Sequence, residues 1–482
     1  MTVPETDYLV IGAGALSMAF TDSIVDGCEA RVTIVDRHAK PGGHWNVAYP
    51  YVTLHQPSAT YGINSMDLGD DRIDTGGPNA GLYELATGTQ VRDYFERAMN
   101  ERFLPGGQVA YHPMSDYVGP VEGEEGVHRF RSILGGEETR IRVRRKLVDG
   151  RDFTARVPAT EKRKFAVADG VRITTPGRLP ECWLGEDWQR PSQYVLLGAG
   201  KTAMDAGVWL LQMGVDPADI AWVRPRETWM INRLATQPGL DHLPATVDWQ
   251  LHQMLAAKDA ENADDIFLAL EERGHMLRLD RTRLPTKFVF PTISEGEVDL
   301  LRGIENVIRI GRLSSIERGM LHGQDGDAAV ADDALFIDCT ASAASRQPVE
   351  QIWQAGRIVP QLLQVPLVSL SAAVIGHIEA TFPDDDATKN AIAVPAQITD
   401  SPAHYPQAML NNAMNRMLWS QNEALSDWLA KQRLDPGARI AKVIGGADRE
   451  TKAAAMRIRE ATVAAVPNLQ KLAMKAPQAE SA

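Results

Sequence analysis

The stretch Tyr8-Leu9-Val10-Ile11-Gly12-Ala13-Gly14-Ala15-Leu16-Ser17 decides the fold class of this chain. Its four leading apolar residues predict a buried strand, and the glycines predict a tight turn into a helix. The first glycine allows the turn, the second lets another group approach the backbone, and the small Ser17 lets helix and strand pack closely. The free N–H groups and the helix dipole at such a turn favour a pyrophosphate. The residues predicted to line this dinucleotide site are Gly12, Gly14, Ala15 and Ser17.

The residues after this turn support the same interpretation. Residues 15–24 predict a helix, and residues 31–35 predict a second strand that ends on Asp36. Asp36 lies 22 positions beyond Gly14, close to the roughly 20 positions at which an acid bonds the ribose of a dinucleotide. We therefore expect Asp36 and the adjoining Arg37 to contact the adenosine end of the ligand.

A second motif, Gly198-Ala199-Gly200-Lys201-Thr202-Ala203, follows the apolar run Tyr194-Val195-Leu196-Leu197. Residues 202–213 predict a helix and residues 219–223 the next strand. Lys201 either contacts a phosphate or is a solvated surface lysine; the spacing of a P-loop is absent. The residues predicted to line this second nucleotide site are Gly198, Gly200, Lys201 and Thr202.

The strand of this second motif ends on Arg224-Pro225-Arg226 instead of on an acid. An arginine at this position accommodates a 2′-phosphate, which an acid would repel. Arg224 and Arg226 therefore favour NADPH over NADH. The alternative is that both are surface arginines on a loop.

The segment Pro41-Gly42-Gly43-His44-Trp45, shortly after Asp36, resembles an element of the flavin-containing monooxygenases, the Baeyer–Villiger monooxygenases and their two-domain relatives. Those families carry a Gly-Gly-x-Trp element against the flavin. The resemblance implies that Gly43, His44 and Trp45 lie along FAD. The alternative is a glycine turn followed by a core tryptophan.

Residues 334–341 predict a buried strand and resemble the Asp-x-Thr-Gly element with which these flavoproteins return to the FAD domain. Ala341 stands where the families have glycine. The resemblance implies that Asp338 and Ala341 contact FAD, because small residues allow a cofactor to approach the backbone. The alternative is a core strand followed by a turn.

The segment 54–62 corresponds approximately to a polar Asn-x-Ser stretch that lies at the flavin and the nicotinamide in the flavin-containing monooxygenases. Gln56 and Ser58 are the nearest equivalents, and Gln56 is also predicted to contact FAD. With His55 they are the candidate catalytic residues. A purely structural role for His55 and Gln56 remains the alternative.

The two motifs together predict an α/β protein with two Rossmann-like, doubly wound dinucleotide-binding domains, the second inserted in the first. Residues 1–190 would form the first part of the FAD-binding domain, and residues 191–334 the NAD(P)H-binding domain with a helical insertion near 244–276. Residues 335–482 would complete the FAD domain and form a mostly helical C-terminal part.

The resemblance implies a monooxygenase-like oxidoreductase that uses FAD and NADPH to oxygenate a small organic substrate with O2, through a flavin hydroperoxide. Those families also carry a Phe-x-Gly-x-x-x-His element before the second motif, but residues 151–190 contain no histidine. An NADPH-dependent flavin reductase or dehydrogenase without oxygen insertion therefore stays open. A third alternative is a nucleotide-binding sensor or scaffold without catalytic activity.

Composition narrows the remaining function classes. The net charge of −13 disfavours nucleic acid and anionic membrane surfaces as partners. The three cysteines form no Cys-x-x-Cys pair, which excludes a redox dithiol of that spacing and fits the reducing cytoplasm. The first strand is entered by Tyr8, which leaves no room for a signal peptide, and no apolar run has the length of a membrane span. The sequence shows no metal-ligand spacing, and no pattern in it indicates whether the protein is a monomer or an oligomer.

Overall fold

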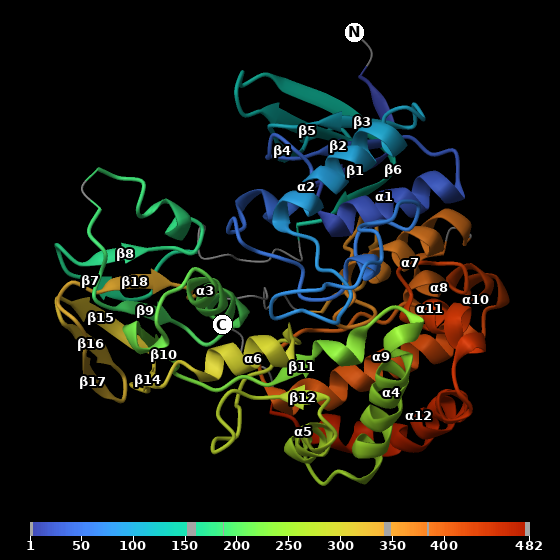
Figure 1. Ribbon diagram of the computed structural model, residues 1–482. Helices are drawn as coiled ribbons and strands as arrows, with labels where there is room; N and C mark the ends of the chain where they lie inside the picture. The colour runs from blue at the N-terminus through green and yellow to red at the C-terminus, as the bar shows by residue number, and fades with distance from the viewer. Residues whose placement is uncertain (1–2, 152–160, 187, 342–348, 383–384, 478–482) are drawn as a thin grey trace.

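The computed structural model describes residues 3–151, 161–186, 188–341, 349–382 and 385–477. The chain forms two sheets built on parallel strands, with helices, and a third, mostly helical part, as the sequence predicts (Figure 1). In this view the first sheet lies near the N-terminus at the top, the second sheet at the lower left and the helical part at the lower right.

The first sheet has the strand order β19-β20-β6-β1-β2-β3. Its central strands β6, β1, β2 and β3 run parallel. Helices α1 (Ala15–Gly27) and α7 (Val368–Thr381) cover one face, and the antiparallel hairpin of β4 and β5 continues from β6 over the other. The strands are β1 (Glu5–Ile11), β2 (Val32–Val35), β3 (Val109–His112), β4 (Ser115–Pro120), β5 (Val127–Ser132), β6 (Glu138–Asp149), β19 (Trp353–Gln354) and β20 (Arg357–Ile358).

The second sheet is parallel throughout, with the order β14-β10-β9-β18-β8. Helices α3 (Lys201–Gln212) and α6 (Glu295–Arg302) cover one face, and the small sheet β17-β16-β15-β7 covers the other. The strands are β7 (Ala166–Val167), β8 (Arg172–Thr174), β9 (Tyr194–Leu197), β10 (Ile220–Val223), β14 (Asn306–Ile308), β15 (Leu313–Glu317), β16 (Met320–Gly323), β17 (Gly326–Ala329) and β18 (Leu335–Asp338).

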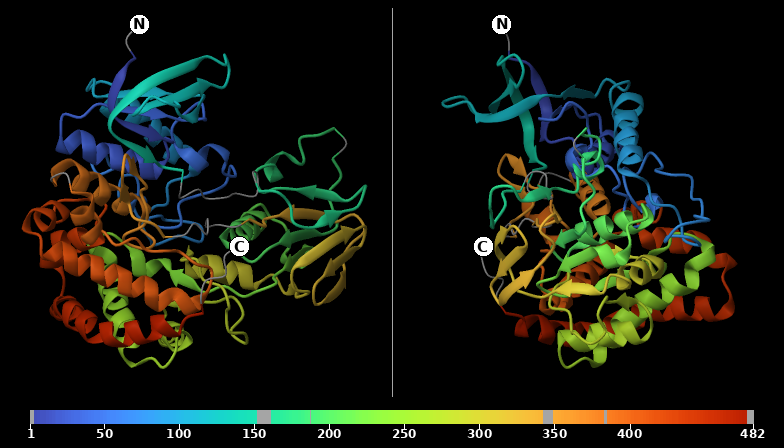
Figure 2. Two further views of the ribbon diagram at one scale, coloured as in Figure 1. Left: turned by 180° about the vertical axis from the view of Figure 1, so that it is seen from behind. Right: turned by 60° about the vertical axis from the view of Figure 1, so that its left-hand side comes forward.

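The helical part combines two distant stretches of sequence. Helix α4 packs against α12 and α5, and α12 also packs against α9; the reverse view in Figure 2 shows the green and red helices side by side. Their shared core joins Trp229, Phe267 and Phe288 to Tyr405 and Leu469. Among the described residues, no helix is both long enough and apolar enough to cross a membrane. The elements are β11 (Met230–Asn232), α4 (Leu243–Asp259), α5 (Ala263–Glu272), β12 (Met276–Leu277), β13 (Thr292–Ile293), α8 (Asp386–Ala391), α9 (Tyr405–Ser420), α10 (Glu423–Leu429), α11 (Pro436–Val443) and α12 (Arg449–Lys475).

Three details differ from the sequence-based expectations. Strand β18 does not return to the first sheet at residue 335 but pairs with β9 and β8, and the chain rejoins the first sheet at β20. Strand β8, inside the residues 1–190 predicted to form the first part of the FAD-binding domain, belongs to the second sheet. We call the first sheet with its helices the first unit, and the second sheet with its helices the second unit. The predicted helical insertion packs against α9 and α12 and is not part of the second unit. A short apolar element has the same local pattern whichever partner it finds, so these pairings were not predictable.

The small side chain of Ser17 is required by the strand that lies beside the first glycine turn. Gly150, directly after β6, donates its N–H to the carbonyl of Ile11 at 3.0 Å. A Cβ on Gly150 would lie 1.9 Å from Ser17 Oγ and 2.8 Å from the Ile11 carbonyl oxygen. The third position of the motif therefore packs against Gly150, and both residues must be small.

We expect Gly150→Ala to destabilise the protein by about 1–3 kcal/mol, because overpacking a tight backbone contact forces a shift. Urea unfolding measures this change. Gly445→Ala is the matched control: nothing lies within 4 Å of its added Cβ, so its effect should stay within about 0.5 kcal/mol. Equal stability of both variants would contradict the close packing.

Candidate functional site

The first glycine turn brings two predicted elements into backbone contact. Gly12 has φ +94°, and Gly43 has φ +57°. A Cβ on Gly43 would lie 2.9 Å from the Cα of Gly14. Gly42 also donates its N–H to the Ala13 carbonyl at 2.8 Å. The Gly-Gly-His-Trp element and the glycine turn thus form one cradle of bare backbone, which suits a pyrophosphate.

The structure places Asp36 at this turn and Arg37 away from it. The Asp36 carboxylate is buried and accepts hydrogen bonds from the Ala13 N–H at 2.5 Å and the His38 N–H at 2.6 Å. Arg37 lies on the surface, 3.6 Å from Asp116. Asp36 therefore keeps its predicted position at the strand end, while Arg37 does not join it.

The structure adds Gly150, which the sequence analysis did not single out. Its backbone closes the first turn from the side of β6. The signal was present in the sequence: Gly150 directly follows the run Lys146-Leu147-Val148-Asp149, and a glycine at a strand end marks a close backbone approach.

The second glycine turn is built in the same way. Gly198 has φ +112°, and a Cβ there would lie 3.5 Å from the Cys339 carbonyl oxygen. Cys339 follows β18 and donates its N–H to Leu197 at 3.1 Å. Cys339 therefore has the same relation to the second turn as Gly150 has to the first.

This arrangement places Asp338 at the second turn. Its carboxylate accepts from Arg163 Nε at 3.0 Å and from the Thr340 hydroxyl at 2.5 Å. Ala341 follows at the end of this described stretch. Asp338 and Ala341, which were predicted to contact FAD, therefore lie at the end of a strand of the second sheet, beside the second glycine turn.

The two arginines predicted to bind a 2′-phosphate, Arg224 and Arg226, have different surroundings. The Arg224 guanidinium lies 5.0 Å from the centre of the Trp222 ring, and its buried Nε has no hydrogen-bond partner in the described part of the chain. Arg224 also lines a cavity of about 530 Å³ together with Arg309. Arg224 Nη2 lies 3.4 Å from the Glu227 carboxylate, and Arg226 donates to Asp400 at 2.8 Å. Both arginines thus already face a carboxylate, and Arg224 differs in its Nε, unpartnered among the described residues, and in its place beside the cavity.

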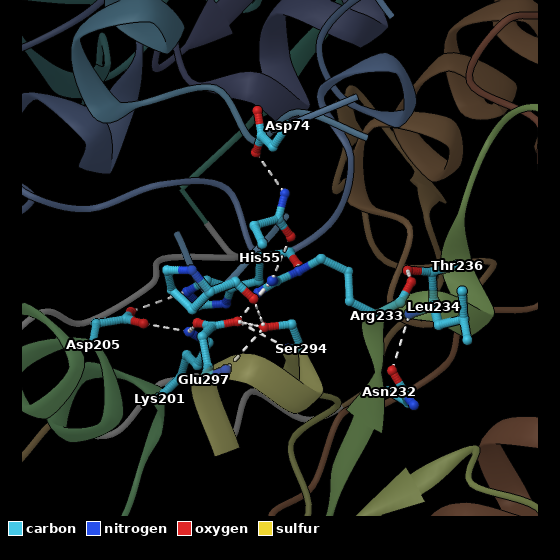
Figure 3. A network of polar contacts seen from close by, with 12 residues as sticks. His55, Asp74, Lys201, Asp205, Asn232, Arg233, Leu234, Thr236, Ser294 and Glu297 are labelled. Atoms are coloured by element: carbon cyan, nitrogen blue, oxygen red, sulfur yellow. Dashed lines mark hydrogen bonds and ion pairs between the residues drawn. The ribbon is translucent and has the colours of Figure 1, made fainter. Parts of the chain in front are cut away.

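Lys201 is neither a solvated surface lysine nor free to contact a phosphate. Its side chain is only 9% exposed, and its ammonium contacts the carboxylate of Asp205 and that of Glu297, the latter at 3.0 Å (Figure 3). Asp205 stands one turn further along α3, whereas Glu297 comes from α6. Lys201 is thus a buried member of an ion-pair network beside the second turn.

Arg233 extends this network to the first unit. Its side chain is 1% exposed, and Nη1 lies 2.6 Å from Glu297. Nε donates to the His55 carbonyl at 2.8 Å, and Nη1 to Asn79 at 2.8 Å. Figure 3 shows these residues converging between the two units. We call Lys201, Asp205, Arg233 and Glu297 the junction network.

The junction network balances two cations against two anions, and this keeps all four groups charged. Burial alone raises the pKa of Glu297, but Lys201 and Arg233 outweigh it and lower the pKa to about 2. Burial likewise raises the pKa of Asp205, yet Lys201 and His55 hold it well below its usual range. The pKa of Lys201 is lowered by desolvation but raised overall by the two carboxylates.

The candidate catalytic segment reaches this network through His55. His55 Nε2 lies 3.5 Å from Asp205, whose carboxylate also accepts from the Tyr49 hydroxyl at 2.6 Å. Ser58 is buried in a structural role, since its hydroxyl donates to the Glu84 carbonyl at 3.0 Å and accepts from Ala86 at 2.8 Å.

The other predicted site residues near His55 are Gln56, Trp45 and His44, all from the first unit. Gln56 is half-buried beside His55. Trp45 is buried and donates to the Tyr61 hydroxyl at 2.9 Å, which fixes the loop that carries His55 and Gln56. Desolvation, with a further contribution from His55, lowers the pKa of His44 to about 4.

Tyr49 and Tyr51 were missed in the sequence, although Tyr49-Pro50-Tyr51 is a conspicuous aromatic pair between two candidate elements. Tyr51 is stacked on Trp209 of α3 with ring centroids 4.8 Å apart, and it lies 4.9 Å from Tyr49. Both tyrosines therefore connect the first unit to α3.

Asp248, His252 and His275 form a cluster with metal-ligand chemistry in the helical part. The Asp248 carboxylate accepts from His275 Nε2 at 2.7 Å, lies 3.0 Å from His252 Nδ1, and accepts from Arg273 at 3.0 and 3.1 Å. Because Arg273 occupies both carboxylate oxygens, the geometry is that of a hydrogen-bonded cluster.

The residues present fit the two expected nucleotides. The first turn offers bare backbone at Gly14 and Gly43 beside a buried carboxylate, Asp36. The buried Tyr111 hydroxyl, which Asp36 influences electrostatically, has no partner within the described residues. Near the second turn, the buried Nε of Arg224 likewise has no hydrogen-bond partner among the described residues. Each turn therefore has a glycine cradle and an unsatisfied polar atom near its strand end.

No family model matches the chain. It is 38% identical over 431 residues to the uncharacterized protein Rv2000 of Mycobacterium tuberculosis (strain ATCC 25618 / H37Rv), an alignment that covers 89% of this chain and 78% of that protein. The uncharacterized protein Mb2023 of Mycobacterium bovis matches with the same identity and coverage. The chain belongs to the family of these uncharacterized mycobacterial proteins.

Flavin monooxygenases are among the solved structures that the chain resembles. A flavin-containing monooxygenase from Stenotrophomonas maltophilia is 14% identical, covers 78% of this chain and 98% of its own, and gives a TM-score of 0.42. The S-allyl-L-cysteine S-oxygenase from Allium sativum is 11% identical, with 98% and 100% covered and a TM-score of 0.46. An open structure of cyclohexanone monooxygenase is 12% identical, with 81% and 92% covered and a TM-score of 0.48. These values are too low to transfer a ligand or a reaction to this chain.

Breaking the junction network should strongly destabilise the protein. We expect Lys201→Met to cost about 3–5 kcal/mol, because it leaves two buried carboxylates with Arg233 as their one remaining network cation. The control is Lys40→Met, which removes an exposed pair with Glu96 and should cost at most about 1 kcal/mol. Urea unfolding at pH 7 compares them, and equal losses would contradict the role of the network.

The lowered pKa of His44 predicts a specific pH dependence. The unfolded chain protonates this histidine near pH 6.5, whereas the folded protein does so only near pH 4. The unfolded state therefore binds more protons between these values, and stability falls as the pH falls from about 6.5 to 4. His377, whose pKa burial also lowers to about 4, acts in the same direction.

We expect His44→Asn to lessen this loss of stability at low pH, and His377→Asn to lessen it by a similar amount. Burial also lowers the pKa of His112, His128 and His275, so each single variant should keep part of the loss. Thermal unfolding between pH 7 and pH 4 measures it. A His44→Asn profile that parallels the wild type throughout this range would show that His44 does not contribute.

Proposed function

We propose that this protein is an FAD-containing, NADPH-using oxidoreductase of the monooxygenase type, which oxygenates a small organic substrate with O2. The observation that carries the proposal is the link between the two glycine turns. Tyr49 and His55 of the first unit contact Asp205, which lies in the helix that begins at the second turn. Two nucleotides held at these turns would extend toward the same junction.

In the first unit, the backbone around Gly14 and Gly43 would hold the pyrophosphate of FAD. Asp36 would accept from a ribose hydroxyl at the strand end. His44 and Trp45 continue from Gly43 and would lie along the cofactor. Because the pKa of His44 is lowered to about 4, its imidazole is neutral at pH 7 and adds no charge there.

In the second unit, the N-terminus of α3 and the backbone of Gly198 and Gly200 would hold the pyrophosphate of NADPH. Arg224, at the end of β10, would bind the 2′-phosphate. Lys201 would act indirectly, since its ammonium positions Asp205 and Glu297 instead of reaching a phosphate.

At the junction, the chain supplies orientation and exclusion of water. Bound FAD would accept a hydride from NADPH and pass electrons to oxygen. Asp205 holds the Tyr49 hydroxyl and lies beside His55, so the first-unit loop keeps a fixed position against α3. The aromatic rings of Tyr51 and Trp209 stack beside this region and add an apolar contact between the two units.

A flavin reductase or dehydrogenase without oxygen insertion is the second candidate. It is favoured by one observation: residues 151–190 contain no histidine, although the resembling families carry one before the second motif. For either function we infer a cytoplasmic location, because Cys28, Cys182 and Cys339 are free thiols, as a reducing compartment keeps them.

The test is the visible spectrum of the purified protein during anaerobic addition of NADPH, followed by air. Bleaching with NADPH, and a transient band at shorter wavelength before the oxidised spectrum returns in air, would support oxygenation. Immediate return of the oxidised spectrum would support the reductase. A yellow protein that neither NADPH nor NADH bleaches would overturn both enzyme functions, and failure to bind added FAD would overturn the first-site assignment.

Arg224 and Arg226 give a matched pair for cofactor preference. We expect Arg224→Ala to raise the KM for NADPH about 10–100-fold with little change for NADH, because a hydrogen bond to a charged phosphate is lost. Arg226→Ala should change the KM for NADPH less than about threefold, since the pair of Arg226 with Asp400, at 2.8 Å, is closer than that of Arg224 with Glu227, at 3.4 Å. The reverse pattern would assign the 2′-phosphate to Arg226.

A further inference from the structure

The Tyr51 hydroxyl is a buried polar group without a partner. Its oxygen makes no hydrogen bond to any residue that the structure describes. The ring is stacked on Trp209 with centroids 4.8 Å apart at 16°, and its centroid lies 4.9 Å from that of Tyr49 at 44°. The ring is thus fixed by packing, while the hydroxyl is left unsatisfied.

Tyr51 lies where the two units meet. Its ring packs against the core beneath the first sheet and also against the core of the second sheet, which includes Cys339. Cys339 and Asp205 both act electrostatically on its hydroxyl. Because burial, Cys339 and Asp205 all raise the pKa of Tyr51, the hydroxyl stays protonated and is available as a donor.

Tyr51 is linked to the second sheet through Trp209 of α3 and through the core that contains Cys339, the residue directly after β18. The strand order β14-β10-β9-β18-β8 reverses its direction of progression between β9 and β18, and dinucleotides bind across such a switch point. Arg224 follows β10 and would mark the adenosine side. The other end of the ligand would then extend toward the end of β18, where Cys339 lies.

The cost of the arrangement argues against a purely structural hydroxyl. A buried donor without a partner costs about 1–3 kcal/mol, and a phenylalanine would fill the same space without that cost. Tyr49 shows the contrast, because its hydroxyl is satisfied by Asp205 at 2.6 Å. A hydroxyl kept at Tyr51 therefore calls for an acceptor that comes from outside the chain.

We propose that the Tyr51 hydroxyl donates a hydrogen bond to the carboxamide oxygen on the nicotinamide ring of NADP(H) bound at the second turn. The inference rests on the proposed function, because it requires a nicotinamide nucleotide at this site. It assigns to Tyr51 the recognition of the nicotinamide end, separate from the 2′-phosphate and pyrophosphate contacts. A ring carbonyl of the flavin offers the same acceptor chemistry, and the test separates the two.

The test compares Tyr51→Phe with Tyr49→Phe by calorimetric titration of the FAD-loaded protein. The first titrant is NADP⁺, and the second is 2′-phospho-ADP-ribose, which lacks only the nicotinamide ring. We expect Tyr51→Phe to weaken NADP⁺ binding about tenfold, the effect of one net hydrogen bond. Binding of 2′-phospho-ADP-ribose should be unchanged.

Thermal unfolding without added nucleotide gives an independent readout. Tyr51→Phe should be as stable as the wild type or more stable, because it removes an unsatisfied buried group. Tyr49→Phe should be less stable, because it removes the bond to Asp205. A clear loss of stability in Tyr51→Phe would show a structural hydroxyl and overturn the inference.

Two further outcomes would also overturn it. Equal weakening of both titrants, or of neither, would show that Tyr51 does not read the nicotinamide. Unchanged NADP⁺ binding together with a shifted flavin absorption spectrum would assign the hydroxyl to the flavin. Wild-type protein that binds neither titrant would instead refute the proposed function, so the two failures are distinguishable.

Discussion

The buried balance of charge at the junction is the constraint on which the rest of the structure depends. Lys201 lies between Asp205 and Glu297, and Arg233 completes the balance. The desolvation of such groups is costly, and their mutual attraction offsets it only while all partners are present. Arg233 also donates to the His55 carbonyl. The first unit therefore cannot separate from the second without exposing Arg233 to solvent or removing it from Glu297. The network therefore specifies how the two sheets face each other more than it adds to stability.

A second constraint is repeated in both units. Each glycine turn is closed by the residue that follows a neighbouring parallel strand, Gly150 in the first unit and Cys339 in the second. Each sheet also has helices on one face and a small, mainly antiparallel layer on the other. The same packing problem, a parallel sheet with one glycine turn at its edge, is thus solved twice in one chain.

The local parts of this arrangement were predictable from sequence. A strand, a glycine turn and a helix within about 20 residues are one continuous pattern, and so both turns and Asp36 were found. The environment of Lys201 was not predictable, because Glu297 lies 96 positions away and is brought close only by the tertiary fold. Ser58 matched a functional pattern, but its hydroxyl satisfies backbone groups of a distant segment.

The same limit applies to the larger assignments. β18 is a short apolar strand whose sheet is decided by its partners, and the core around Trp229 is completed by residues near Tyr405 and Leu469. Pattern alone contains no information on which of two sheets, or which distant helices, will cover an apolar face. Tyr51 was missed for a related reason: an aromatic residue next to a proline looks like ordinary packing until the lack of a partner for its hydroxyl is seen.

An unsatisfied polar atom indicates a ligand only in the right surroundings. Thr21 and Ser23 of α1 also carry buried hydroxyls without partners among the described residues, but both lie within a single helix of the first unit. The cluster at Asp248 is the opposite case, rich in ligating groups yet satisfied internally by Arg273 and His275. Tyr51 combines what each of these lacks, because its hydroxyl is unsatisfied and lies between two cores at a sheet edge. Burial without a partner is costly, and at a junction where Lys201, Asp205, Arg233 and Glu297 are all paired, that cost is best explained by a partner on the bound nucleotide.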